Sequence, residues 1–251
     1  MKKNTIFITG ASSGLGKSLA LIYAKPENTL FLCGRNRERL FQTAADCKEK
    51  GATVYTYEFD VTDAFAVQEA VLNAESVHHI DLIIANAGVS GGILGIAEDG
   101  VQTRQVFNTN INGVVNTVLP ALERMRKRKK GQIAIVSSIA GYRGLPSAPA
   151  YSASKACVKA WGEALRGWLC AEGIKVNVIC PGFIKTPLTD ANKFRMPFLM
   201  TPEKAAKIIE KGIRKNKGII TFPWPMALGA WFMAVMPAFI VHPILRWLPK
   251  K

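Results

Sequence analysis

Three polar side chains in the middle of the sequence could together perform acid–base chemistry on a carbonyl group. Tyr151 and Lys155 stand four residues apart, and Ser138 precedes Tyr151 by thirteen residues. On a helix, positions i and i+4 share one face, so the phenol and the ammonium would be neighbours. One hydroxyl would then hold a carbonyl oxygen while the other delivers a proton as hydride arrives at the carbon.

Free tyrosine has a pKa of about 10 and exchanges protons poorly at neutral pH. An ammonium one helical turn away favours the phenolate, so we expect Lys155 to lower the pKa of Tyr151. A Tyr–Lys pair at this spacing also occurs by chance on solvated helices. The interpretation therefore depends on Ser138 joining the pair.

A glycine-rich segment near the start of the chain is typical of a phosphate-binding turn. It reads Thr9-Gly10-Ala11-Ser12-Ser13-Gly14-Leu15-Gly16 and lies between a β-branched run and an amphipathic stretch. Glycines there let backbone N–H groups approach a pyrophosphate at the N-terminus of a helix. The spacing is GxxxGxG rather than GxGxxG, and an ordinary strand-to-helix turn remains the alternative.

Elements that could position these residues alternate along the chain up to about residue 221. Seven β-branched runs predict strands at 5–9, 29–33, 53–58, 81–85, 132–137, 175–180 and 218–221. Six amphipathic stretches predict helices at 15–24, 37–50, 64–74, 102–126, 150–172 and 202–215. Right-handed crossovers then give an α/β fold with a doubly wound parallel sheet, covered on both faces. Ser138 and Tyr151 would lie at the carboxyl edge of that sheet, where such folds bind ligands.

Taken together, these motifs resemble the short-chain dehydrogenase/reductase family over about residues 4–221. The residues that carry the resemblance are Thr9 to Gly16, Asn86-Ala87-Gly88, Ser138, Tyr151-Ser152-Ala153-Ser154-Lys155 and Pro181-Gly182. By composition, residues 222–251 form an apolar C-terminal segment. The resemblance implies a Rossmann-type sheet of seven parallel strands in a single domain, residues 1–221. It also implies a nicotinamide cofactor and a Ser-Tyr-Lys-Asn catalytic set.

In that set, Tyr151 would be the acid/base, Ser138 would polarise the substrate oxygen, and Lys155 would hold the nicotinamide ribose and lower the pKa of Tyr151. The fourth member is implied to be Asn110, three residues before Gly113. Its neighbours Asn108 and Asn112 are interpreted as capping or solvent-exposed residues.

The resemblance further implies which residues bind the cofactor. They are Gly10, Ser12, Ser13, Gly14, Leu15, Gly16, Arg35, Asp60, Val61, Asn86, Ala87, Gly88, Tyr151, Lys155, Pro181, Gly182, Ile184 and Thr186. Among them, Asp60 and Val61 would line the adenine pocket. The alternative for Asp60 is a simple acidic residue at the start of a helix, which the helix dipole favours anyway.

Cofactor choice follows from the end of the second predicted strand. Gly34 stands where an NAD enzyme presents a carboxylate to the ribose 2′-hydroxyl, and Arg35 follows it. A guanidinium fork suits a 2′-phosphate, and Arg37 strengthens the local positive field, whereas Arg39 fits a solvated helix start. The sequence therefore favours NADP(H) over NAD(H).

Composition and charge bear on nucleic-acid partners, metal sites and cellular location. The net charge of +15 suits anionic ligands, and the run Arg124 to Lys130 is basic, but no aromatic residues or nucleic-acid module accompany it. We interpret that run as a solvated helix end and expect no nucleic-acid partner. The five cysteines form no CxxC pair and predict buried, reduced thiols without a metal site. The first ten residues lack a signal-peptide core, so we expect a cytoplasmic protein.

Two apolar segments bear on the substrate and on partners. Residues 183–202 occupy the position of the family's substrate lid, and their apolar residues favour an apolar carbonyl or alcohol substrate, although ordinary loop packing would explain them too. The 28 residues from Gly218 to Leu245 contain no Asp, Glu, Lys or Arg, and four prolines divide them. The longest proline-free piece, Met226 to Met236, would span about 17 Å as a helix, which is too short for a hydrocarbon core of about 30 Å.

We therefore expect the C-terminal segment either to dock on a membrane surface, through Trp224, Trp231 and Trp247 with Arg246, Lys250 and Lys251, or to pack against another subunit. The family resemblance implies a homodimer or a homotetramer. A non-catalytic NADP(H)-binding sensor or scaffold is the alternative function. The intact Ser138, Tyr151 and Lys155 argue against it.

Overall fold

A computed structural model of the chain describes residues 4–90, 98–190 and 196–246. Within these ranges, seven strands form one parallel sheet in the order β3-β2-β1-β4-β5-β6-β7. The strands are β1 (Thr5–Thr9), β2 (Thr29–Gly34), β3 (Thr53–Glu58), β4 (Leu82–Ala85), β5 (Gly131–Val136), β6 (Ile174–Pro181) and β7 (Ile219–Phe222). The strand order reverses direction between β1 and β4, which is the switch point where doubly wound sheets bind their ligands.

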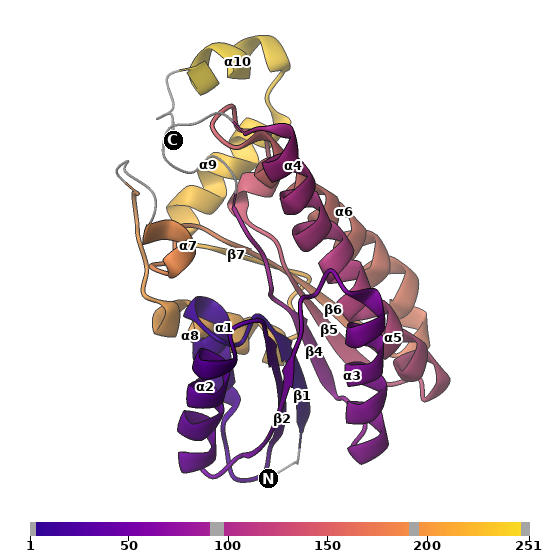
Figure 1. The fold of residues 1–251 in the computed structure, drawn as a ribbon. Coiled ribbons are helices and arrows are strands. Elements are labelled where there is room, and N and C mark those ends of the chain that lie inside the picture. The colour runs from indigo at the N-terminus through magenta and orange to yellow at the C-terminus, as the bar shows by residue number, and fades with distance from the viewer. Residues whose placement is uncertain (1–3, 91–97, 191–195, 247–251) are drawn as a thin grey trace.

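Helices cover both faces of the sheet, as Figure 1 shows. One face carries α1 (Gly14–Tyr23), α2 (Arg37–Glu49) and α8 (Pro202–Arg214). The other face carries α3 (Ala64–Val77), α5 (Gly113–Lys127) and α6 (Pro149–Leu169), with α4 (Gly100–Phe107) beside α6. A short helix, α7 (Pro187–Asp190), follows β6, and α9 (Trp224–Val235) and α10 (Ala238–Arg246) follow β7.

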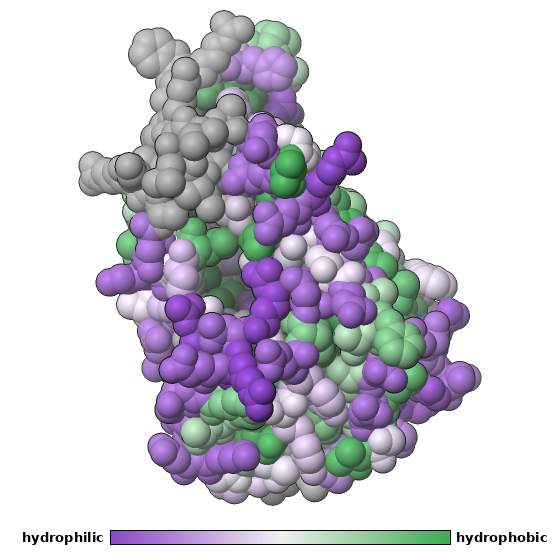
Figure 2. Space-filling view, viewed as in Figure 1, coloured by the Kyte–Doolittle hydropathy of each residue, from purple (hydrophilic) through white to green (hydrophobic). Residues whose placement is uncertain are grey.

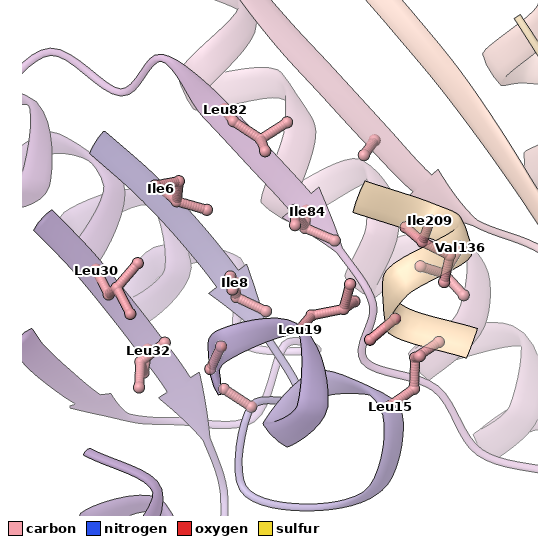
Figure 3. Packing of buried hydrophobic residues seen from close by; sticks show 14 of the residues in the cluster. Ile6, Ile8, Leu15, Leu19, Leu30, Leu32, Leu82, Ile84, Val136 and Ile209 are labelled. Atoms are coloured by element: carbon pink, nitrogen blue, oxygen red, sulfur yellow. The ribbon is translucent and has the colours of Figure 1, made fainter. Parts of the chain in front are cut away.

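Alternation along the strands divides the core into two clusters. In β1, Ile6 and Ile8 point toward the α1 face and pack with Leu19 of α1 and Ile209 of α8 (Figure 3). Phe7, between them, points to the opposite face and packs in the cluster of α3, α5 and α6. Because both faces are covered, every residue of β1 is buried, which explains why the strand reads as a continuous apolar run.

The seven predicted strands are confirmed, but the long helix predicted over residues 102–126 is wrong as a single element. The segment instead forms three consecutive elements: α4, a π-helical turn at Asn108–Asn112, and α5. The N–H of Gly113 donates to the carbonyl of Asn108, an i to i+5 bond that widens the turn. At Gly113 a side chain would collide with Val61, so α5 passes unusually close to the loop after β3.

Two predictions about surface residues need correction. Cys33, Cys47 and Cys180 are buried free thiols, but Cys157 and Cys170 are exposed. The basic run Arg124 to Lys130, which begins in the last turn of α5, is more than a solvated helix end. In it, Arg126 forms a two-bond ion pair with Glu172, and Arg128 pairs with Glu75 while donating to a main-chain carbonyl.

The apolar tail folds into the two helices α9 and α10, which stand beyond the carboxyl edge of the sheet (Figure 1). β7 extends through Phe222, one residue past the expected boundary, and α9 contacts both β7 and the turn Ile139–Gly141. Among the described residues, no helix has the length and apolar character needed to cross a bilayer. Trp247, Lys250 and Lys251 lie outside the described residues.

Candidate active site

The glycine-rich turn is shaped by close approaches that only glycine permits. Gly10 and Gly14 have φ angles of 67° and 52°, in the left-handed region. A Cβ on Gly10 would lie 2.9 Å from Cα of Ala87, and a Cβ on Gly16 would collide with the carbonyl oxygen of Gly10. The turn therefore leaves its backbone bare beside the N-terminus of α1, the arrangement that admits a pyrophosphate.

The end of β4 is tied to this turn by reciprocal hydrogen bonds. Thr9 Oγ1 accepts from the N–H groups of Asn86 and Ala87, at 3.1 and 3.3 Å. The Asn86 amide donates to the carbonyls of Thr9 and Gly10, at 3.0 and 3.3 Å. Sequence reasoning had no signal that assigned Thr9 this organising role, because its hydroxyl acts on a strand that follows 75 residues later.

Ser138, Tyr151 and Lys155 meet at the carboxyl edge of the sheet, as their spacing predicts. Ser138 follows β5; its Oγ accepts from the N–H of Ala140 at 3.1 Å and hydrogen-bonds with the Tyr151 phenol. One turn of α6 separates Tyr151 from Lys155, whose Nζ lies 5.8 Å from the centroid of the Tyr151 ring. Lys155 Nζ donates to the carbonyl of Val136 at 3.0 Å, and the side chain is only 4% exposed.

Burial shifts the pKa values of Tyr151 and Lys155 at this cluster. Burial raises the pKa of Tyr151 above its ordinary value, and the hydrogen bond with Ser138 only partly offsets this effect. Burial and the Ser138 hydrogen bond set the direction of this shift, and a lowering of the pKa by Lys155 stays a prediction. Its ammonium is directed at the Val136 carbonyl, and burial lowers the pKa of Lys155 itself from 10.5 to about 8.

Asn110 connects this cluster to the loop after β4. It is fully buried in the π-helical turn, where its amide accepts from the N–H of Val89 at 2.8 Å and donates to the Val89 carbonyl at 2.9 Å. It also donates to Ser154 Oγ at 3.0 Å, on the same turn of α6 as Lys155. Asn108 and Asn112 are exposed and bond to each other, so Asn110 is the asparagine of the three that faces the cluster.

Gly88, in the loop after β4, lies against both Asn110 and Lys155. A Cβ there would lie 3.1 Å from Asn110 Oδ1 and 3.3 Å from Lys155 Nζ. The loop of Asn86, Ala87 and Gly88 therefore runs between the glycine-rich turn and the cluster of Ser138, Tyr151 and Lys155. A side chain at position 88 would therefore crowd Asn110 and Lys155.

Two residues predicted for different parts of the cofactor, Arg35 and Asp60, form an ion pair. Arg35 Nη1 lies 3.1 Å from Asp60 Oδ2, with both side chains partly exposed. Asp60 Oδ1 accepts from the N–H of Thr62 at 2.9 Å. Burial alone would raise the pKa of Asp60, but the hydrogen bonds from Thr62 and the charge of Arg35 outweigh it and hold the pKa below its ordinary value.

Gly34, which precedes Arg35, lies against the glycine-rich turn, since a Cβ on it would lie 3.1 Å from Ser12 Oγ. Arg37 stacks over Phe41 and lies 3.9 Å from Glu58, whereas the side chain of Arg39 is exposed on α2. Of these three arginines, Arg35 is the one that directly follows β2, and Asp60 holds its guanidinium there.

The segment that follows β6 packs against the glycine-rich turn through Thr186. The N–H of Gly182, next to Pro181, donates to the Phe222 carbonyl at 2.7 Å, and a Cβ on Gly182 would lie 3.0 Å from Met226 of α9. Ile184 is buried and pairs with Met200, and Thr186 packs against Gly14. Of the apolar residues predicted for the lid, Phe198 and Leu199 are exposed, and Phe194 lies outside the described residues.

Glu98 is a residue that sequence reasoning missed. Helix α6 begins without a side-chain cap of its own, because Ala148 at the N-cap has no acceptor. Glu98 supplies one from outside, since its Oε2 accepts from the N–H of Ala150 at 2.7 Å, directly before Tyr151. Nothing in the local sequence indicates a cap that comes from 52 residues away.

Comparison with known proteins agrees with this geometry. Residues 4–195 match the family model described as short chain dehydrogenase. An uncharacterized oxidoreductase of Myxococcus xanthus is 39% identical over 239 residues, which cover 94% of each chain.

Solved structures show the same fold with either nucleotide. A 3-oxoacyl-[acyl-carrier protein] reductase from Brucella melitensis with bound NAD has a TM-score of 0.76 at 24% identity, covering 88% of each chain. A variant of actinorhodin polyketide ketoreductase with NADPH also has a TM-score of 0.76, at 26% identity, covering 88% of this chain and 95% of that one. The fold alone therefore does not determine which of the two nucleotides this chain binds.

Proposed function

This chain belongs to the short-chain dehydrogenase family of nicotinamide-dependent oxidoreductases, and from that premise we propose that it uses NADPH to reduce an apolar carbonyl compound to an alcohol. The observation that carries the proposal is the meeting of Ser138, Tyr151 and Lys155 at the carboxyl edge of the sheet, with the loop of Asn86 to Gly88 between them and the glycine-rich turn. Protein side chains cannot supply hydride, and the bound nicotinamide would supply it.

The described residues fit such a cofactor along its whole length. The bare backbone at Gly10, Gly14 and Gly16 would hold the pyrophosphate, and Asp60 and Val61 would hold the adenine. At the other end, Tyr151 and Lys155 would hold the nicotinamide ribose. Gly88 lets the loop after β4 pass close to Lys155, since a side chain there would crowd the ammonium.

The protonation state of Tyr151 suits a proton donor. Because burial raises the pKa of Tyr151, the phenol stays protonated at neutral pH and can act as an acid toward a carbonyl oxygen. Ser138, which bonds to the same phenol, would hold that oxygen in line with it. Lys155, with a pKa of about 8, is mostly cationic at pH 7 and would stabilise the phenolate left behind.

Asn110 acts through the backbone rather than on the substrate. It holds Val89, and through Ser154, which donates to the Tyr151 carbonyl at 2.8 Å, it holds the turn of α6 that carries the acid. Its role in this proposal is to fix the distance between the loop after β4 and Lys155.

NADP(H) is favoured by Arg35. Its partner Asp60 holds the guanidinium beside the carboxyl end of β2, where a ribose 2′-phosphate would lie. No carboxylate replaces Gly34, so nothing on that residue repels the phosphate.

We also propose how the subunits assemble and where the protein resides. Helices α5 and α6 expose Leu119 and Trp168, and this surface would pair subunits in a homodimer or homotetramer. All five cysteines are free thiols, which fits the reducing cytoplasm.

Turnover can be tested directly. The full chain would be incubated with NADPH and a panel of apolar ketones and quinones, and the absorbance of NADPH followed. We expect oxidation with at least one apolar ketone. Tight NADPH binding without any turnover across the panel would favour the alternative function, a non-catalytic sensor or scaffold.

A further inference from the structure

Helices α9 and α10 expose a large apolar surface. Trp224 is 76% exposed and Phe239 is 77% exposed. The other large apolar residues exposed on these helices are Leu228, Trp231, Phe232, Val235, Ile240 and Ile244. Ala230, Val241 and Leu245 are buried, so each helix is anchored on one side and presents the other. Figure 2 shows hydrophobic residues at the end of the molecule where α10 lies.

Polar groups that a protein partner would bond are scarce on this surface. Along α9 and α10 the side-chain hydrogen-bonding groups in the sequence are the indole N–H groups of Trp224 and Trp231, the imidazole of His242 and the terminal Arg246. Protein interfaces of standard size carry on the order of ten hydrogen bonds and a polar rim. A second protein surface would gain few of these here, whereas a hydrocarbon phase requires none.

The C-terminal part of the sequence carries charge of one sign. No Asp or Glu follows Glu210 in the sequence. The basic residues after that position are Lys211, Arg214, Lys215, Lys217, Arg246, Lys250 and Lys251. At the junction of α9 and α10, Arg143 Nη1 donates to the Met236 carbonyl at 3.4 Å. An apolar face with cations and no carboxylate in its own segment complements an anionic lipid surface.

The lengths of the helices determine how they could lie. At a rise of about 1.5 Å per residue, α9 and α10 are each shorter than about 20 Å, against a hydrocarbon core of about 30 Å. Indole rings are favoured at the boundary between headgroups and acyl chains. We propose that α9 and α10 dock the protein on the surface of an anionic bilayer, with both helices lying in the plane of the membrane.

Docking there would bring the candidate active site close to the lipid. Pro223 and Met226, at the start of α9, pack against Gly182 at the end of β6, and α9 also contacts the turn that follows Ser138. If the proposed function holds, an apolar substrate dissolved in the bilayer would be next to the carboxyl edge of the sheet. The docking itself does not depend on that function.

Co-sedimentation with vesicles tests the proposal on the full chain. We expect the protein to pellet with vesicles of phosphatidylcholine containing phosphatidylglycerol at low salt, and much less with pure phosphatidylcholine or at high salt. Phe239→Ser should weaken the binding by about tenfold or more, because one buried aromatic side chain is lost from the lipid contact. The matched control is Phe65→Ser, at a phenylalanine that is 71% exposed on α3 and should bind as the unmodified chain does.

Two results would overturn the proposal. One is a full chain that stays in the supernatant with anionic vesicles at low salt; if Phe239→Ser then dissociates an oligomer in size-exclusion chromatography, the surface binds a second copy instead. The other is equal vesicle binding by the Phe239→Ser and Phe65→Ser variants. Both residues are exposed, so thermal melts should show folded variants. Tyr151→Phe should bind vesicles normally, so loss of docking and loss of turnover remain separate outcomes.

Discussion

At the scale of single residues, Lys155 combines its proposed chemical role with a cost in stability. Burial lowers its pKa from 10.5 to about 8, so the folded protein holds the cation less well than the unfolded chain does. A shift of this size corresponds to about 3 kcal/mol at neutral pH, because each pKa unit is worth about 1.4 kcal/mol. The hydrogen bond to the Val136 carbonyl offsets part of that penalty.

We therefore expect Lys155→Met to raise the free energy of unfolding at pH 7 by about 1–2 kcal/mol while removing turnover. The penalty is full below the folded pKa of about 8 and disappears as pH rises toward the unfolded value of 10.5, so the advantage of the variant should shrink over that window. Urea denaturation at a series of pH values would measure this. A variant that is less stable than the unmodified chain at pH 7 would contradict the assigned burial cost.

Arg35 carries the expected cofactor preference. Removing a charge-assisted, paired contact to phosphate costs about 1.5–3 kcal/mol, so Arg35→Ala should weaken NADPH binding roughly tenfold to a hundredfold and leave NADH binding unchanged. Fluorescence titration with both nucleotides would measure this. Arg39→Ala, at an exposed side chain on the same helix start, is the matched control. Equal affinity of the unmodified chain for NADH and NADPH would end this account of specificity.

The site residues differ in how far the sequence could assign them. The spacing of Tyr151 and Lys155 and the strand before Ser138 were enough to bring the three together at one edge. The pKa of Tyr151 could not be predicted, because it depends on burial by parts of the chain remote in sequence. The partnership of Arg35 with Asp60 likewise joins the ends of two strands that no local pattern relates.

At the scale of elements, the start of α6 decides where Tyr151 lies. Glu98 caps that helix through the N–H of Ala150, and losing a cap costs about 0.5–2 kcal/mol. We expect Glu98→Ala to lower kcat and the melting temperature together, whereas Glu98→Gln, which retains an acceptor, should keep most of both.

Asp99→Ala is the control for this prediction. Asp99 caps α4 by accepting from the N–H of Gln102 at 2.7 Å, and α4 carries none of the proposed catalytic residues. Its loss should lower stability by a similar amount with little effect on kcat. If the two alanine variants reduce kcat equally, Glu98 has no special role in positioning Tyr151.

Strands were predicted better than the helices that follow them. Buried parallel strands can be recognised in a sequence as continuous β-branched and apolar runs. The strands β1 to β7 all lie within a residue or two of their expected bounds. The π-helical turn at Asn108–Asn112 was not predictable, because its cause is tertiary. Asn110 there bonds to the backbone of Val89 across the site.

At the scale of the whole molecule, the switch point between β1 and β4 explains why residues far apart in the sequence converge. The glycine-rich turn, the loop of Asn86 to Gly88, Ser138 and the start of α6 all follow the carboxyl ends of central strands. The crossover rule predicts this convergence from the strand order alone. The two C-terminal helices could not be predicted in the same way, since prolines and uniform hydrophobicity removed the periodicity that indicates a helix.

The central claim is that this fold positions Tyr151 as the acid of an NADPH-dependent reduction. Measuring kcat for ketone reduction and the Kd for NADPH in parallel, on the unmodified chain and on Tyr151→Phe, tests it most directly. The phenylalanine ring still packs, so the account predicts a fall in kcat of about a hundredfold to ten-thousandfold, the range that a positioned proton donor contributes, with the Kd for NADPH largely unchanged. A variant that retains near-normal kcat would contradict the claim.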